Sequence, residues 1–155
     1  IKWPNDIVVN GKKVCGILAE MSTERDFIHY VVMGVGINVA RQDFPPEIAQ
    51  TASCLEQECG RAVSRAEIMV NVMKAFEKYY GIFCRDGSLA GLLERYNGML
   101  AGKDGEVRVL DPKGEFRGIS RGISSTGELL VEREDGTVEP VYAGEVSVRG
   151  IYGYV

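Results

Sequence analysis

The sequence has 155 residues, 45% of them hydrophobic, enough to bury the core of one domain with a small second one. Its formal net charge of −4 comes from 18 basic and 22 acidic residues. That balance argues against sequence-independent binding of nucleic acid, which needs an extended basic face. No apolar stretch reaches the roughly 18 residues of a membrane span, and no signal peptide opens the chain. We therefore expect a cytoplasmic protein that binds neither nucleic acid nor membrane through this segment.

The first part of the sequence predicts antiparallel strands. Residues 7–9 are β-branched, and Asn10-Gly11 is a strong hairpin signal because both residues tolerate positive φ. Residues 12–21 would then return as a second strand. The largely apolar run 27–35 predicts a third strand in the centre of the sheet.

Helices are predicted next. Ser53 with Glu56, and Ser64 with Glu67, match the S-x-x-E capping box, in which side chain and backbone satisfy each other's free donors. After Ser64, apolar residues recur at helical spacing and predict one stripe that faces the core: Ile68, Val72, Phe76, Tyr80 and Phe83. A shorter helix is indicated over residues 89–96.

From about residue 101 the pattern changes to short strands separated by tight turns. The predicted strands are 106–110, 116–123, 129–132, 138–142 and 146–148. Five short strands in so few residues favour a small closed barrel. The predicted fold is therefore α+β over residues 1–100, followed by a β-barrel over residues 101–155.

The cysteines predict no site of their own. Cys15, Cys54, Cys59 and Cys84 form no C-x-x-C pair, and His29 is the single histidine that could complete a metal site. Cys15 lies in an apolar run, where cysteine is usually a small buried residue. We expect reduced thiols and no metal bound by protein side chains.

Two polar segments near the start could carry chemistry. Lys2-Trp3-Pro4-Asn5-Asp6 combines a cation, an aromatic plane and a rigid turn, although a simple turn capped by Asn5 and Asp6 would also explain it. By strand alternation Lys13 shares a face with Cys15. An ionised lysine on an apolar face either meets an anion or sits at the rim in water, and both remain open.

A third polar segment is Gly34-Val35-Gly36-Ile37-Asn38, which follows the apolar third strand. It fails the dinucleotide pattern G-x-G-x-x-G because Val39 replaces the last glycine. Two glycines would still let a ligand approach the backbone. The Asn38 amide could pair with adenine N6 and N7, or could simply cap the strand end.

Together these motifs are specific. In their order and spacing, K-W-P-N-D, G-K-K-V-C-G-I-L-A-E and G-V-G-I-N resemble the catalytic domain of biotin protein ligases. The tail motifs R-G-I-S-x-x-G-E-L-L-V and G-E-V-S-V-R resemble that family's C-terminal SH3-like barrel. The resemblance implies a partial class II synthetase-like mixed sheet of the biotin/lipoate ligase type, followed by that barrel.

The resemblance also implies a two-step reaction. Biotin's carboxylate attacks the α-phosphate of ATP, and a lysine of a carboxylase biotin carboxyl carrier domain then takes the biotin from biotinyl-5′-AMP. Mg²⁺ would accompany ATP, and a homodimer is possible in this family. The roles that the resemblance carries over are catalysis by Lys13, Lys2 and Asp6, biotin binding by Lys13, Gly16, Leu18 and Gly36, and ATP binding by Lys2, Asn5, Asn38, Glu145 and Arg149.

One family motif has no match in these residues. Biotin protein ligases carry a phosphate-binding G-R-G-R-x-G-R loop upstream of K-W-P-N-D, and the sequence, which opens at Ile1 without methionine, reads like a cut through a longer protein. We therefore expect the 155 residues alone to be inactive. The alternatives are a non-catalytic module for dimerisation or carrier docking, and, less favoured, a lipoate protein ligase.

Overall fold

The computed structural model describes residues 1–25, 27–111, 114–143 and 147–150. The chain divides into two compact units, one made of Ile1–Pro4 with Ser64–Val155 and the other of Asn5–Val63. The predicted boundary near residue 100 concerns the family's two domains and stays a prediction.

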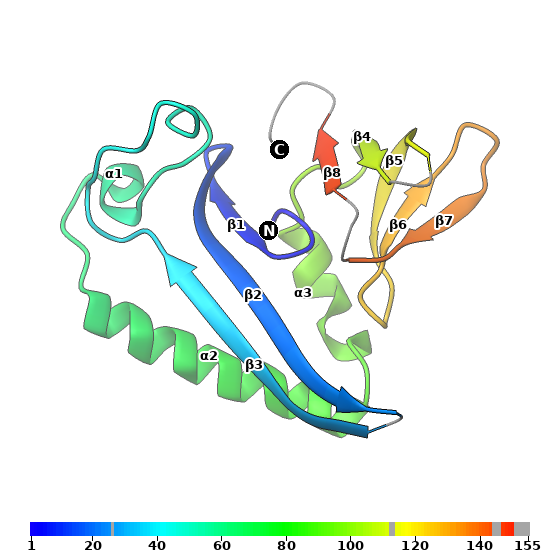
Figure 1. Cartoon of the computed structure of the whole chain (residues 1–155), viewed down its shortest axis with the longest axis horizontal. Coiled ribbons are helices and arrows are strands. Elements are labelled where there is room, and N and C mark those ends of the chain that lie inside the picture. The colour runs from blue at the N-terminus through cyan, green and yellow to red at the C-terminus, as the bar shows by residue number, and fades with distance from the viewer. Residues whose placement is uncertain (26, 112–113, 144–146, 151–155) are drawn as a thin grey trace. The chain divides into compact units, whose positions relative to one another are not determined.

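A three-stranded antiparallel sheet forms most of the Asn5–Val63 unit (Figure 1, blue to cyan). Its strands are β1 (Asp6–Val9), β2 (Lys12–Glu24) and β3 (Phe27–Ile37), in the order β1-β2-β3. The predicted hairpin at Asn10-Gly11 is confirmed, because both residues have positive φ, of 51° and 75°. This pair of angles fits the tight turn whose twist matches that of the flanking strands.

The prediction that the third strand is central is wrong for the described residues. Strand β3 pairs with β2 alone, and its apolar side chains are exposed; Tyr30, for example, is 61% exposed and Val32 is 54% exposed. An apolar run shows that a strand has surface to bury. It does not show which neighbour buries that surface.

A loop with the short helix α1 (Leu55–Cys59) follows the sheet. The capping box predicted at Ser53 and Glu56 is wrong, because the N-cap is Cys54 and its side chain makes no capping bond. The Ser53 hydroxyl instead donates to Glu58, which also accepts from the Asn10 amide. Glu58 thereby ties the hairpin turn to this loop, and these bonds hold the pKa of its carboxyl below the ordinary value.

The other unit begins its helical part with α2 (Arg65–Asp86), where the second capping box is confirmed: the Glu67 amide donates to the Ser64 hydroxyl at 3.3 Å. The predicted core stripe is not buried in the described residues, since α2 contains no buried residue and Tyr80 is 53% exposed. The aromatic rings of this stripe stack on one another, and the ring centroids of Phe76 and Tyr80 are 5.3 Å apart. Among the described residues no helix is long and apolar enough to cross a membrane.

A five-stranded antiparallel sheet follows the short helices η1 (Ala90–Leu92) and α3 (Leu93–Gly98), which occupy the region predicted to be helical. Its strands are β4 (Glu106–Leu110), β5 (Phe116–Ile123), β6 (Leu129–Glu132), β7 (Val138–Val141) and β8 (Ser147–Gly150). The order is β7-β6-β5-β4-β8, so among the described strands β7 and β8 each have one neighbour and the sheet is not closed. The predicted closed barrel is corrected to an open, SH3-like sheet.

The core of this unit encloses Trp3, from the other end of the chain. Trp3 is 5% exposed and packs with residues of the sheet that include Val109 and Leu129. Its indole N–H donates to the carbonyl oxygen of Gly127 at 3.0 Å. Partly buried side chains of the helical segment pack on the same core, and burial raises the pKa of one of them, Tyr96, to about 12.

Candidate active site

Lys13 and Asp6 form an ion pair in the Asn5–Val63 unit. The Lys13 ammonium lies 2.6 Å from Oδ1 of Asp6, and the two side chains are 39% and 12% exposed. Asp6 opens β1 and stands opposite Gly16 of β2, which places its carboxylate beside the start of β2. The pair is thus fixed by strand pairing on one side while the ammonium remains accessible to a ligand.

A bulge decides the direction of the Lys13 side chain. Ile7 stands opposite Cys15 whereas the next residue, Val8, stands opposite Lys13, so Val14 is the extra residue in β2. A bulge breaks the alternation of faces. The prediction that Lys13 shares a face with Cys15 is therefore wrong: its ammonium lies over Gly16, where a Cβ would be 3.0 Å from Nζ and Cε of Lys13.

Glycines leave the backbone of β2 and β3 bare beside this ion pair. Gly16 stands opposite Gly36, and Leu18 stands opposite Gly34. These residues line an open groove of about 480 Å³, together with Asn5, Lys13, Ile17 and Val35. Small-molecule sites commonly have about 300–1,000 Å³ and few polar groups, so the groove can accept a small ligand with its anionic end at Lys13.

The two asparagines named by the sequence hold backbone segments in place. Asn5 donates its amide N–H to the carbonyl oxygen of Ile17 at 2.7 Å. The side-chain amide of Asn38 donates to the carbonyl oxygen of Ser53 at 3.1 Å, and its backbone N–H donates to the carbonyl oxygen of Val14. Asn38 therefore does act as a strand-end cap, and one of its two amide N–H groups is engaged in that bond.

The cysteines contribute no nucleophile to the groove. All four are free thiols; Cys15 and Cys54 are buried, and Cys59 and Cys84 are exposed. The pKa of the Cys15 thiol is raised, mainly by burial. The charge of Lys13 acts to lower this pKa, and the charge of Asp6 acts to raise it. A protonated buried thiol is inert, so Cys15 acts as a packing residue.

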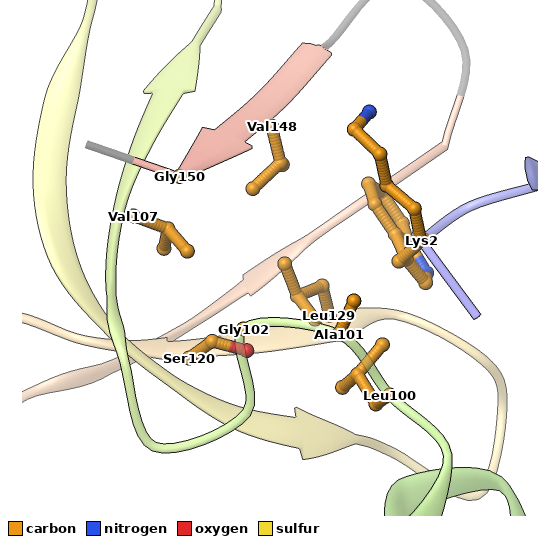
Figure 2. Close-up of a pocket in the computed structure, with 10 residues that line it drawn as sticks. Lys2, Leu100, Ala101, Gly102, Val107, Ser120, Leu129, Val148 and Gly150 are labelled. Atoms are coloured by element: carbon orange, nitrogen blue, oxygen red, sulfur yellow. The ribbon is translucent and has the colours of Figure 1, made fainter. Parts of the chain in front are cut away.

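Lys2 belongs to the unit that contains the five-stranded sheet. With Trp3 it lines a small cavity of about 30 Å³, which is also lined by core residues such as Leu100, Ser120 and Val148. Figure 2 shows Lys2 at one edge of the cavity, above Leu129. The space suits a single water molecule, not a nucleotide.

Of the two residues of the C-terminal sheet predicted to bind ATP, Glu145 and Arg149, only Arg149 can be placed. Arg149 lies on β8, is exposed, and stands directly opposite Arg108 of β4. Glu145 lies outside the described residues, so its predicted contact with ATP stays a prediction.

Sequence reasoning missed two features of the site. Trp3 was expected in a polar motif, whereas it is a core residue held by a bond to a residue 124 positions away. Gly34 lines the groove, as expected for one of the two glycines that let a ligand approach the backbone, but it was given no role in biotin binding. Its spacing of two residues from Gly36 was the available signal, because residues two apart on a strand share a face.

Comparison with known protein families matches both ends of the chain. Residues 1–38 match the model of the Biotin/lipoate A/B protein ligase family, and residues 105–149 match the Biotin protein ligase C terminal domain. The chain belongs to the biotin protein ligases. The ligase motifs read from the sequence are thus confirmed as family motifs.

Individual ligases match along almost the whole chain. The Bifunctional ligase/repressor BirA of Bacillus subtilis is 38% identical over 152 residues, which are 96% of this chain and 46% of the relative. BirA of Escherichia coli is 30% identical over 149 residues, again 46% of the relative. The chain therefore spans about half the length of these curated ligases.

Solved ligase structures share the fold. The apo structure of biotin protein ligase from Aquifex aeolicus matches with a TM-score of 0.83 and 29% identity. The match covers 97% of this chain and 64% of the Aquifex chain. The same enzyme in complex with biotin and ATP has a TM-score of 0.80, with 61% of that chain covered.

Proposed function

We propose that the protein to which this chain belongs activates biotin with ATP and transfers it to a lysine of a biotin carboxyl carrier domain. The relatives' names support this reaction class, since one from Paracoccus denitrificans is a Biotin--[acetyl-CoA-carboxylase] ligase. A matching ligase structure holds biotin and ATP. We also propose a cytoplasmic location, and homodimerisation stays a possibility of the family.

One observation carries the proposal: the Lys13–Asp6 pair stands at a groove whose floor is bare backbone. Biotin would lie on the glycine floor, walled by Gly16, Leu18 and Gly36, with its carboxylate at the Lys13 ammonium. When that carboxylate attacks the α-phosphorus of ATP, negative charge develops on the phosphoryl oxygens. A fixed cation in a preorganised position stabilises this charge more than it stabilises the substrates.

Asp6 has two proposed tasks. Its carboxylate, 2.6 Å from Nζ, holds Lys13 in one orientation. It is also a base that could accept a proton from the acceptor lysine, whose neutral amine attacks the mixed anhydride of biotinyl-5′-AMP and releases AMP. A mainly buried carboxylate suits both tasks because water competes little for it.

For ATP we propose contacts from Lys2, Asn5, Asn38, Glu145 and Arg149. Arg149 would contact a phosphate, with a charge-assisted bond of the kind guanidinium groups form well. Mg²⁺ would arrive with ATP, and we assign it no protein ligands. Residues 1–100 and 101–155 would be the catalytic and SH3-like domains.

The test compares two neighbouring lysines in the complete protein. Lys13→Ala should slow biotin- and ATP-dependent pyrophosphate release by about 30- to 1,000-fold, or about 2–4 kcal/mol, as expected for loss of one preorganised donor. Lys12→Ala is the matched control and should change the rate less than about threefold. Equal effects of the two substitutions would show that Lys13 does not face the reacting groups. Faster adenylation of lipoate than of biotin by the unaltered protein would favour a lipoate ligase.

A further inference from the structure

Three arginines stand side by side across the C-terminal sheet. Arg108 of β4 is directly opposite Arg117 of β5 on one side and Arg149 of β8 on the other. Opposite residues of antiparallel strands have Cβ atoms about 4.5–5.5 Å apart and share a face of the sheet. We call these three residues the arginine row; it extends over about 10 Å, or two strand spacings.

The row lies on the outer face of the sheet. Val107 and Val109, the neighbours of Arg108 along β4, are 4% and 0% exposed and belong to the core. Arg108 itself is exposed, as are Arg117 and Arg149. Strand alternation therefore directs all three guanidinium groups away from the core and into solvent.

The row concentrates positive charge at a cost to the sheet. Like charges directly opposite on neighbouring strands destabilise the pairing. Other arginines of the chain, Arg85, Arg121 and Arg133, pair with carboxylates. Within the described ranges no ion pair joins a carboxylate to any member of the row. The nearest acidic positions along the strands are Glu106, two residues from Arg108, and Glu115, two residues from Arg117, so the row keeps an excess of positive charge.

We propose that the arginine row binds a carboxylate-rich surface of a protein partner. Each guanidinium can hold a carboxylate with two parallel hydrogen bonds, and arginine is enriched at protein interfaces because it is weakly hydrated. The partner's carboxylates would lie opposite the row and relieve the repulsion among its members. The chain's net charge of −4 makes the row a local exception that can select both the partner and its orientation.

The geometry favours a protein surface over the other anions. A mononucleotide site is usually a concave pocket that covers most of its ligand, whereas Arg108 and Arg117 stand on the open face of a sheet. Nucleic acid needs an extended basic face, and a row about 10 Å long in an acidic chain does not provide one. A protein surface with two or three acidic side chains at strand-like spacing fits both the length and the flatness.

The inference does not rest on biotin ligation. Because Arg149 also has a proposed nucleotide contact, the experiment leaves it unchanged. Arg108→Gln/Arg117→Gln removes two charges from the row. Arg61→Gln/Arg65→Gln removes two charges from exposed arginines outside the sheet and is the matched control.

The probe is a fluorescent peptide of four Glu-Ser repeats, which presents a carboxylate at every second residue. Binding to the 155-residue chain is measured by fluorescence anisotropy at 20 and 150 mM NaCl, with far-UV circular dichroism to verify folding. A Gln-Ser peptide, inorganic tripolyphosphate and a twelve-residue oligothymidylate are the comparison ligands.

We expect the Glu-Ser peptide to bind the unaltered chain, and more weakly at the higher salt concentration. The row variant should bind it about five- to tenfold more weakly, and the control variant less than twofold. Equal binding by the two variants would overturn the proposal. So would equal binding of the Gln-Ser peptide, or tighter row-dependent binding of tripolyphosphate or oligothymidylate, which would assign the row to phosphates.

Discussion

Gly16→Ala should displace the Lys13 ammonium without unfolding the sheet. The new Cβ would lie 3.0 Å from Nζ and Cε of Lys13 and 3.5 Å from Oδ1 of Asp6. Carbon atoms in contact prefer about 3.5–4.0 Å, so the end of the lysine must move by about 0.5–1 Å. That movement lengthens or breaks the 2.6 Å ion pair with Asp6.

The cost should appear in the reaction and not in stability. A half-exposed ion pair contributes at most about 1 kcal/mol, and alanine is about 0.5–1 kcal/mol better than glycine in a strand, so the two effects nearly cancel. A catalytic group displaced by about 1 Å can lose on the order of 100-fold in rate. We therefore expect kcat to fall about 10- to 100-fold, or about 1.4–2.7 kcal/mol, at nearly unchanged free energy of unfolding.

The assay is biotin- and ATP-dependent pyrophosphate release by the complete protein, with urea unfolding measured in parallel. Gly81→Ala in α2 is the matched control, because a Cβ there would meet no atom within 4 Å and the residue does not line the groove. A second readout independent of turnover is the acylation rate of Lys13 by an N-hydroxysuccinimide ester, with Lys12 as reference; it should rise when the ion pair is lost. An unchanged kcat in Gly16→Ala, with an unchanged acylation rate, would refute the reasoning.

Three further predictions concern bonds described above. Asn38→Ala should raise the KM for ATP and leave biotin affinity without nucleotide unchanged; normal ATP kinetics would reduce Asn38 to a strand-end cap. The pKa of Glu58 is lowered in the folded state, so its bonds stabilise the fold above pH 4.5 and this stability is lost as the pH falls through the lowered pKa. Glu58→Gln should therefore flatten the decline of the free energy of unfolding below pH 4.5, and an equally steep decline would contradict the assignment. Trp3→Phe removes the donor to the Gly127 carbonyl and should cost about 1–3 kcal/mol in urea unfolding followed by circular dichroism; a loss below about 0.5 kcal/mol would mean that water replaces the bond.

Features set by local chemistry were predictable from the sequence. Asn10-Gly11 forms the hairpin because two neighbouring residues tolerate positive φ, and Ser64 caps α2 through the amide three residues later. The strands after residue 105 begin and end close to the predicted positions for the same reason: tight turns punctuate them.

Features that depend on distant residues were not predictable. The exposure of β3 and of the α2 stripe depends on which neighbours are present, and periodicity identifies an apolar face without identifying its cover. The face of Lys13 depends on how β1 pairs with β2, because the bulge at Val14 exists only in that pairing. The capping box predicted at Ser53 and Glu56 does not form, because the Ser53 hydroxyl donates its hydrogen bond to the carboxylate of Glu58, five residues later in the sequence.

The burial of Trp3 sets a practical rule for recombining ligases. Residues 1–4 belong to the same compact unit as the C-terminal sheet, and the indole of Trp3 is packed by that sheet's side chains. A chimera that exchanges only the segment after residue 100 would surround this tryptophan with side chains selected for another ligase's indole. The exchangeable block therefore comprises two separate stretches of sequence, and swapping both together should preserve folding where swapping the second alone does not.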